Sequence, residues 1–268
     1  MKAYCINLDR RPDRLTHMTA EFARAGIPFT RISAVDAKDP EVAAAARAVP
    51  LSVLEKARIS PGAYACLQSH RLAWRRMLDE GQAHAAFFED DVLLAPDIGF
   101  LGREDWVPPD ADVVKLETFR VRVQLSRRRR AAAPGWDLAQ MMSAQIGAAA
   151  YILRAETAAR LLALTENLGE PVDQVIFNGA YGFADTALIY QMVPAPAVQG
   201  DRIGAQRQKA VAGWQATSIT ERHAKGQGPV QAGREGKAAR AFRRLREEGR
   251  ALWGGTRYVV VPHGQSGS

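Results

Sequence analysis

The sequence predicts an α/β protein, and two observations carry that prediction. Short apolar runs of strand length alternate with longer stretches of helical periodicity from residue 3 to residue 193. That order is typical of a sheet with helices on its faces. Three consecutive acids, Glu89, Asp90 and Asp91, follow the apolar run at 85–88. Open α/β sheets bind their ligands at the carboxyl ends of the strands, so this strand end is the first place to expect a site.

The first third of the chain predicts a β-α-β unit, a long helix and the acidic strand. Pro12 suits a first helical turn and Gly26 suits a helix C-cap. Ser60 and Pro61 form an N-cap followed by proline at the first helical position. The expected elements are a strand at 3–8, a helix at 12–25, a strand at 29–32, an Ala-rich surface excursion with short helices at 39–56, a helix from 60 to about 80, and the acidic strand at 85–94.

The rest of the chain predicts a second group of strands and then a change of character after residue 199. Segment 119–136 contains Arg127 to Arg130 and fits either a hairpin with a basic tip or a flexible lid. Segment 146–153 consists of small residues, which allow a ligand to come close. The expected elements are strands at 112–116, 146–153 and 188–193, helices at 156–164 and from Pro171, a basic amphipathic helix at 237–253 and an edge strand at 258–261.

Charge divides the chain into two predicted parts, a domain at 1–199 and a basic C-terminal extension at 200–268, partly helical and partly disordered. The net charge is +7, yet residues 201–257 alone hold 13 lysines and arginines against five acids. A basic tail on a nearly neutral domain favours contact with an anionic membrane surface, and no nucleic-acid partner is expected. The helix at 237–253 could equally pack on the domain with its arginines solvated.

Neither terminus nor interior contains a predicted signal peptide or membrane-spanning run. Cys5 and Cys66 lie in apolar contexts, as small buried residues do in a reducing compartment. We therefore expect a cytoplasmic protein, or one held peripherally on the inner face of the cytoplasmic membrane.

The acidic triplet predicts a site for a hard cation, Mn²⁺ or Mg²⁺. In an extended segment side chains alternate, so Glu89 and Asp91 should point to one side and Asp90 to the other. Two carboxylates without sulfur or a histidine pair suit such a cation. A solvated acidic turn is the alternative, and the apolar residues on both sides favour the metal.

The loop after the first strand predicts a diphosphate ligand next to that cation. Arg10, Arg11 and Arg14 surround the start of the first helix, where arginines can hold phosphate oxygens. Beside the acidic triplet, a β-α-β unit that bears these arginines suggests a diphosphate ligand. For any single one of the three, a solvated surface charge is the simpler interpretation.

A displacement at a sugar carbon also needs a base that takes the proton of the acceptor. Asp173, at the start of the helix from Pro171, is the candidate. Asp173 as a helix-capping acid is an equal alternative.

These pieces stand in one order, and the sequence resembles glycosyltransferase family 25. This family comprises lipopolysaccharide-biosynthesis glycosyltransferases, including lipooligosaccharide galactosyltransferases and collagen galactosyltransferase domains. The resemblance covers roughly residues 2–220. The segments that carry it are 6–11 with Arg14, 34–36, Gly62, 66–70, 88–91, 115–116, 147–153 and 171–173, with weaker likeness at 196–199 and 218–219.

The resemblance implies a GT-A-like, Rossmann-type nucleotide-binding fold. It also implies that the protein transfers a hexose, galactose or glucose, from a UDP-sugar to a glycan or lipid-linked acceptor with inversion. It implies that Asp91 binds the metal directly, Glu89 directly or through water, and that Asp90 faces ribose or sugar hydroxyls. No third metal ligand is assigned, although His223 is a candidate. Segments 42–48 and 127–130 depart from the family pattern, and we expect them to shape acceptor choice. The implied substrate-binding residues are Asn7, Leu8, Arg11, Arg14 and Asp36 around the nucleotide, Ser69 and His70 as donor-site support, and Gly147 and Tyr151 in the small-residue segment.

Two further classes of protein remain open from the sequence. One is a non-catalytic nucleotide- or glycan-binding protein tethered by its basic tail. The other is a metal-dependent phosphohydrolase, which would release phosphate or sugar phosphate without any acceptor.

Overall fold

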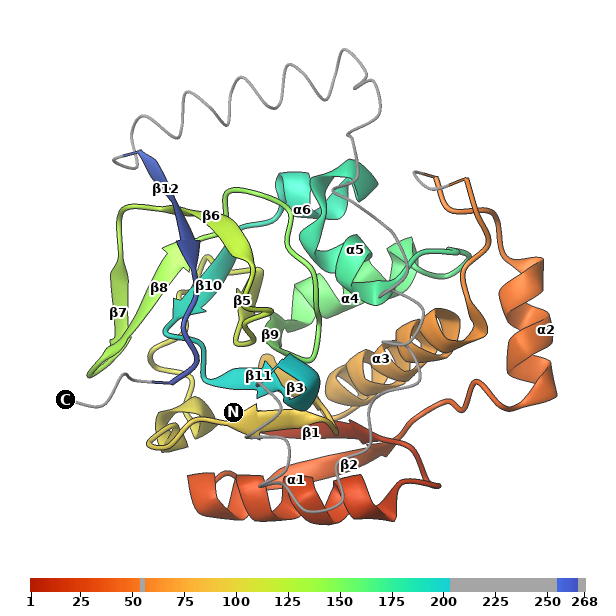
Figure 1. Ribbon diagram of the computed structural model, residues 1–268, viewed down its shortest axis with the longest axis horizontal. Coiled ribbons are helices and arrows are strands. Elements are labelled where there is room, and N and C mark those ends of the chain that lie inside the picture. Colours follow the sequence, from red (N-terminus) through yellow and green to blue (C-terminus); the bar gives the residue numbers. More distant parts are fainter. Residues whose placement is uncertain (54–55, 203–254, 265–268) are drawn as a thin grey trace.

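An eight-stranded mixed sheet organises the protein (Figure 1). The computed structural model describes residues 1–53, 56–202 and 255–264. The strand order is β2-β1-β3-β9-β5-β10-β8-β7, and two small sheets pair β11 with β4 and β12 with β6. The strands are β1 (Lys2–Asn7), β2 (Phe29–Ser33), β3 (His84–Glu89), β4 (Val92–Leu94), β5 (Val113–Lys115), β6 (Arg122–Ser126), β7 (Arg130–Ala133), β8 (Trp136–Gln140), β9 (Ala150–Arg154), β10 (Ile189–Val193), β11 (Ala197–Gln199) and β12 (Thr256–Val260).

Helices cover both faces of this sheet. The α-helices are α1 (Pro12–Ala25), α2 (Pro40–Ala48), α3 (Pro61–Asp79), α4 (Ala155–Leu164), α5 (Val172–Phe177) and α6 (Phe183–Thr186), and short 3₁₀ helices lie at Gly99–Gly102, Gly179–Tyr181 and Gly200–Arg202. Within the described residues, no helix has both the length and the apolar character that a bilayer crossing requires.

The alternation of side chains along β1 and β3 builds two cores. Cys5 and Phe88 face α1 and pack with Met18 and Phe22 on that helix. The intervening residues face the other way, toward α3, α4 and α5, where the second core contains Tyr4, Phe87, Trp74, Leu161 and Phe177. The predicted α/β class is therefore confirmed, with a sheet buried on both faces.

The predicted β-α-β unit and its caps are also confirmed. β1 runs parallel to both β2 and β3. Proline occupies the start of α1, and Gly26 ends that helix in the left-handed conformation, with φ of 66°. The Ser60 side chain accepts a hydrogen bond from the Ala63 amide, as expected for the N-cap of α3.

Two strand predictions need correction. The acidic strand is interrupted, because β3 ends at Glu89 and a turn at Asp90 and Asp91 leads into the separate strand β4. The strand expected at 146–153 begins only at Ala150, because Gly147 has a φ of 84° that a strand does not accommodate.

The segment at 119–136 also folds differently from a hairpin with a basic tip. β6 pairs with β12 near the C-terminus, while β7 pairs with β8 across a turn that contains Gly135 (Figure 1). Residues 127–129 therefore connect β6 to β7, Arg130 begins β7, and the four arginines do not form a hairpin tip.

The edge strand expected at 258–261 is present as β12. It pairs with β6, and Tyr258 lies opposite Gln124. The Thr118 hydroxyl donates to the Val261 carbonyl at 2.7 Å, which ties this segment to the loop after β5. Residues 256–261 thus pack on β6 and on the loop after β5. The predicted helix at 237–253 and His223 lie outside the described residues.

Candidate functional site

The candidate site lies where β1 and β3 end together. Asn7 is the last residue of β1 and Glu89 the last of β3, and the parallel register pairs Ile6 with Glu89. The turn after β3 then places Asp90 and Asp91 beside the start of α1. The β-α-β topology thus brings the first loop and the acidic triplet to one edge of the sheet, as the sequence predicted.

Asp90 points away from the rest of the triplet and into the protein. Its carboxylate accepts hydrogen bonds from Arg14 Nη1 at 2.8 Å and from Asn7 Nδ2 at 2.8 Å. All three side chains are buried. Asp90, Arg14 and Asn7 therefore form an internal ion-pair cluster that fixes the turn, and a contact of Asp90 with ribose or sugar hydroxyls stays a prediction.

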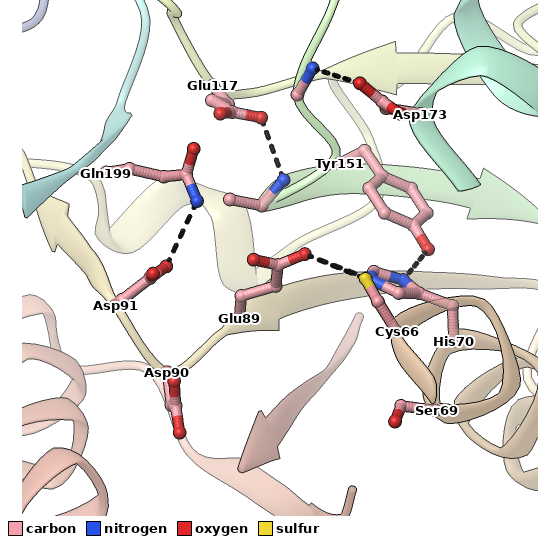
Figure 2. A network of polar contacts seen from close by, with 12 residues as sticks. Cys66, Ser69, His70, Glu89, Asp90, Asp91, Glu117, Tyr151, Asp173 and Gln199 are labelled. Atoms are coloured by element: carbon pink, nitrogen blue, oxygen red, sulfur yellow. Dashed lines mark hydrogen bonds and ion pairs between the residues drawn. The ribbon is translucent and has the colours of Figure 1, made fainter. Parts of the chain in front are cut away.

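Glu89 and Asp91 lie on the opposite side from Asp90, as side-chain alternation predicted (Figure 2). Asp91 is buried, and its Oδ1 accepts from Gln199 Nε2 at 3.3 Å. Burial raises the pKa of both carboxyls, and the neighbouring charge of Asp90 adds to the shift at Glu89, as that of Glu89 does at Asp91. Two adjacent carboxylates with raised pKa values are an unfavourable arrangement unless a cation neutralises them.

The donor set of Glu89 and Asp91 fits a hard divalent cation. Both offer carboxylate oxygens, which Mg²⁺ and Mn²⁺ prefer. Arg14 Nη1 lies 3.7 Å from Asp91 Oδ2 and supplies the only partial neutralisation seen among the described side chains around Asp91. Mn²⁺ or Mg²⁺ is the group these residues would hold.

A buried hydrogen-bonded chain leads to Glu89 from the other side. Trp74 Nε1 donates to the Tyr151 hydroxyl at 2.9 Å, and that hydroxyl lies 2.6 Å from His70 Nδ1. His70 Nε2 lies 3.3 Å from Glu89 Oε1, and the Cys66 thiol donates to the same oxygen at 3.7 Å. Burial lowers the pKa of His70 to about 4, so the imidazole is neutral at neutral pH. His70 and Tyr151 therefore orient Glu89, while Tyr151 itself is fully buried.

Asp173 comes to the same site from the first turn of α5 (Figure 2). Its Oδ2 accepts from the Gly147 amide at 3.0 Å and its Oδ1 from the Gln174 amide at 2.9 Å. Its charge raises the pKa of Cys66 and of Glu89, though less than burial does. The carboxylate is half-buried and held by backbone donors, an arrangement suited to a base that must keep one direction.

Glu117 is a carboxylate of this site that sequence reasoning missed. It is completely buried, and its Oε2 accepts from the Ala149 amide at 2.8 Å and from Lys115 Nζ at 3.4 Å. Its Oε1 has no hydrogen-bond partner among the described residues. Burial raises the pKa of Glu117, whereas the nearby Lys115 ammonium lowers it. An acid directly after the strand predicted at 112–116 was the signal that could have identified it.

Gln199 was noted only as part of a weak motif, yet its amide contacts Asp91 (Figure 2). β11 carries it there, because β11 pairs with β4 directly after the acidic turn. The Gly200 amide also donates to the Asp91 carbonyl at 2.9 Å.

Other residues expected around the nucleotide are engaged with each other. Arg11 forms a two-pronged ion pair with Asp13, at 2.9 and 2.6 Å. Asp36 accepts from Arg10 and from the Lys38 amide. Leu8 is half-buried, and its carbonyl accepts from the Arg11 amide at 2.9 Å.

Ser69 connects two elements of the fold through hydrogen bonds. Its hydroxyl donates to the Ala65 carbonyl at 2.7 Å and accepts from the Val35 amide at 2.9 Å. It thereby ties the loop after β2 to α3, and it does not contact the triplet.

Comparison with known proteins agrees with this geometry. The family described as glycosyltransferase family 25 (LPS biosynthesis protein) matches residues 1–176. A lacto-N-neotetraose biosynthesis glycosyltransferase, LgtB of Neisseria gonorrhoeae, is 32% identical over 195 residues, which cover 66% of this chain and 67% of that protein. LgtE of Neisseria meningitidis serogroup B, with the same description, is 29% identical over 210 residues and covers 74% of each chain.

Similar solved structures are more distant. A glycosyltransferase involved in the glycosylation of the major capsid of PBCV-1 has a TM-score of 0.45 at 7% identity and covers 78% of this chain and 97% of that one. The galactosyltransferase LgtC in complex with donor and acceptor sugar analogs has a TM-score of 0.38 at 13% identity, with 84% and 100% covered. The sequence match is the informative one: it spans about two thirds of the chain and includes Glu89, Asp91 and Asp173, and the chain belongs to glycosyltransferase family 25.

Proposed function

We propose that this glycosyltransferase moves a hexose, galactose or glucose, from a UDP-sugar to a glycan or lipid-linked acceptor during lipopolysaccharide or lipooligosaccharide biosynthesis. The observation that carries the proposal is the meeting of three carboxylates from two distant elements, Glu89 and Asp91 after β3 and Asp173 on α5. The descriptions of the family and of LgtB and LgtE support the acceptor class.

Glu89 and Asp91 would hold the divalent cation, Mn²⁺ or Mg²⁺. When bound, that cation neutralises a diphosphate and stabilises it as a leaving group. Gln199 and Arg14 orient Asp91, while His70 and Cys66 orient Glu89. The two proposed ligands are thus held by different parts of the fold.

Asp173 would remove the proton from the acceptor hydroxyl in a single displacement that inverts the sugar configuration. Backbone amides of Gly147 and Gln174 hold its two oxygens, so the carboxylate needs no side-chain partner to stay oriented. Gly147 has no side chain, and the Glu117 carboxylate occupies the space where a β-carbon would lie, so glycine lets this loop pack against Glu117.

The basic segment at 201–257 would bring the enzyme to an anionic membrane on the cytoplasmic side. Deleting everything after residue 236 would also remove β12, which pairs with β6. A cleaner variant replaces Arg240, Arg243, Arg244 and Arg246 by glutamine. Its binding to vesicles of anionic lipid in low salt should fall, and unchanged binding would exclude a role for these arginines.

UDP release with a panel of UDP-sugars and an oligosaccharide acceptor, with and without Mn²⁺, tests the proposed function. We expect metal-dependent, acceptor-dependent release that Asp91→Asn abolishes and Asp105→Asn retains. Asp105 is a suitable control because its side chain is 69% exposed and pairs only with Arg103 in the described structure. Full activity of Asp91→Asn would refute the metal assignment. Stabilisation by UDP without transfer would favour a binding protein, and phosphate release without acceptor a phosphohydrolase.

A further inference from the structure

Three different metal-ligand types meet on one side of Glu89. Cys66 and His70 are four residues apart on α3, so they occupy the same helix face. That face is directed toward the end of β3 (Figure 2). Cys66 Sγ, His70 Nε2 and a Glu89 carboxylate oxygen all lie within 4.8 Å of one another. A thiol, an imidazole and a carboxylate are the three donors found in tetrahedral zinc sites.

The distances from Glu89 to Cys66 and His70 match those between ligands of a tetrahedrally coordinated zinc ion, so these side chains would move little on binding. Usual zinc–ligand bond lengths and a tetrahedral angle place sulfur and oxygen ligands about 3.6 Å apart and nitrogen and oxygen ligands about 3.4 Å apart. Cys66 Sγ lies 3.7 Å from Glu89 Oε1, and His70 Nε2 lies 3.3 Å from the same oxygen. Both distances to Glu89 thus match those of ligands of one ion, and the Cys66 and His70 ligand atoms lie within 4.8 Å of each other.

We propose that Cys66, His70 and Glu89 form a Zn²⁺ site with three protein ligands and one open position. Sulfur and nitrogen donors favour zinc over Mg²⁺ or Mn²⁺, because those ions prefer an all-oxygen environment. The site is thus chemically distinct from the Glu89 and Asp91 pair, although it shares Glu89. It requires only these side chains and holds whether or not the proposed transferase reaction is right.

Tyr151 and Trp74 supply the second layer of such a site. A zinc-binding histidine usually fixes its second ring nitrogen through a hydrogen bond. His70 Nδ1 lies 2.6 Å from the Tyr151 hydroxyl, which in turn accepts from Trp74 Nε1 at 2.9 Å. With zinc on Nε2, the imidazole proton of His70 would reside on Nδ1, and this N–H would donate a hydrogen bond to the Tyr151 hydroxyl. The Cys66 thiol would release its proton to solvent when it binds the ion. Tyr151 can serve in both states, because a hydroxyl both donates and accepts.

Access to the site is open enough for an ion to enter. Cys66 is partly exposed, and 25% of the Glu89 side chain is exposed, whereas His70 is buried at the inner end. Cys5, the other cysteine, is fully buried in β1 and packs in the opposite core with Met18 and Phe22. It therefore provides a matched control for any effect of removing a thiol.

The test is a titration of the full metal-free chain with Co²⁺ and Zn²⁺, without donor or acceptor. Co²⁺ should give the intense absorption of a tetrahedral thiolate site, and stoichiometric Zn²⁺ should displace it. Cys5→Ala should retain both signals, whereas Cys66→Ala should lose the sulfur absorption and bind Zn²⁺ at least about 100-fold more weakly. Tyr151→Phe keeps all three ligands and should weaken binding about 10-fold.

The proposal fails if the cobalt spectrum lacks a thiolate band in folded wild-type protein. It also fails if Cys66→Ala binds Zn²⁺ as tightly as Cys5→Ala, since the ion would then occupy another site. Circular dichroism of each variant separates loss of a ligand from loss of the fold.

Discussion

The carboxylate of Glu117 occupies the space beside Gly147 where a side chain would begin. A β-carbon built on Gly147 would lie 2.5 Å from Glu117 Oε1, closer than atoms can approach without a shift. Gly147 also has a φ of 84°, which side chains rarely adopt. Its amide holds Asp173, and the Ala149 amide holds Glu117. Glu117 therefore fixes the loop that positions the proposed base.

Gly147→Ala should lower both stability and activity. The methyl group would force Glu117 away from the Ala149 amide and leave a buried carboxylate less satisfied, at a cost of about 1–3 kcal/mol. The positive φ adds about 1–2 kcal/mol. A shift of the loop would displace Asp173, and a 1 Å displacement of a reacting group costs on the order of 100-fold in rate. Urea unfolding and UDP release measure the two effects.

Gly26→Ala is the matched control. Gly26 also has a positive φ, of 66°, but nothing lies within 4 Å of a β-carbon built there. It should lose only the conformational part, about 1–2 kcal/mol, and retain its rate. Equal losses of unfolding free energy in the two variants would show that the contact between Gly147 and Glu117 does not contribute to stability.

Asp90→Asn and Asp91→Asn should have opposite consequences, although the two residues are adjacent. Asp90→Asn removes the nearer of the two carboxylates beside the buried Arg14 guanidinium, at 2.8 Å against 3.7 Å for Asp91, and should destabilise the protein by about 3 kcal/mol. Asp91→Asn removes a carboxyl whose pKa is raised by burial and by Glu89, so its stability should stay within about 1 kcal/mol of wild type or rise. Thermal unfolding without metal measures the stability of the two variants. If Asp91→Asn were the less stable one, the structural role assigned to Asp90 and the ligand role assigned to Asp91 would be reversed.

Because of Glu80, the free energy of unfolding should decrease as the pH drops below about 4.5. Hydrogen bonds from Lys2, Tyr4 and Arg76 lower its pKa to about 2 in the folded protein, below its ordinary value of 4.5. A lowered carboxyl pKa contributes stability that is fully present above the unfolded value and is lost as pH falls through the folded one. The unfolding free energy of Glu80→Gln should therefore decline less between pH 6 and pH 3 than that of wild type.

The control for Glu80 is Glu156→Gln. The Glu156 side chain is 72% exposed and pairs with Arg154 at 3.2 Å on the surface. Exposed pairs contribute little to stability, so this variant should follow the wild-type decline. Equal declines in all three proteins would contradict a special role for the Glu80 cluster.

The sequence predicted those parts of the fold that local patterns determine. Pro12, Gly26 and Ser60 mark helix ends whose backbone needs are local, and α1 and α3 begin and end where expected. β6 shows the limit, because its partner β12 lies more than 100 residues away. Alternating residues in 119–136 identify a strand but contain no information about which strand pairs with it.

The same division holds in the site. The expected separation of Asp90 from Glu89 and Asp91 is seen, although a turn at 90–91 produces it and not the alternation of an extended strand. Glu117 was missed because its proximity to Glu89 depends on β9 entering the sheet between β3 and β5. Likewise, Arg11 and Arg14 were grouped by spacing, yet Arg11 pairs with Asp13 and Arg14 with Asp90.

Asp173→Asn should abolish most activity while preserving the fold. An asparagine keeps the shape of the side chain and can still accept from the Gly147 amide, which the aspartate binds at 3.0 Å. It cannot take a proton from the acceptor, and loss of a general base costs about 100- to 10,000-fold in rate. UDP release should therefore collapse while UDP and Mn²⁺ still raise the melting temperature as in wild type. If Asp173 were only a helix-capping acid, the variant would instead lose stability and keep its rate.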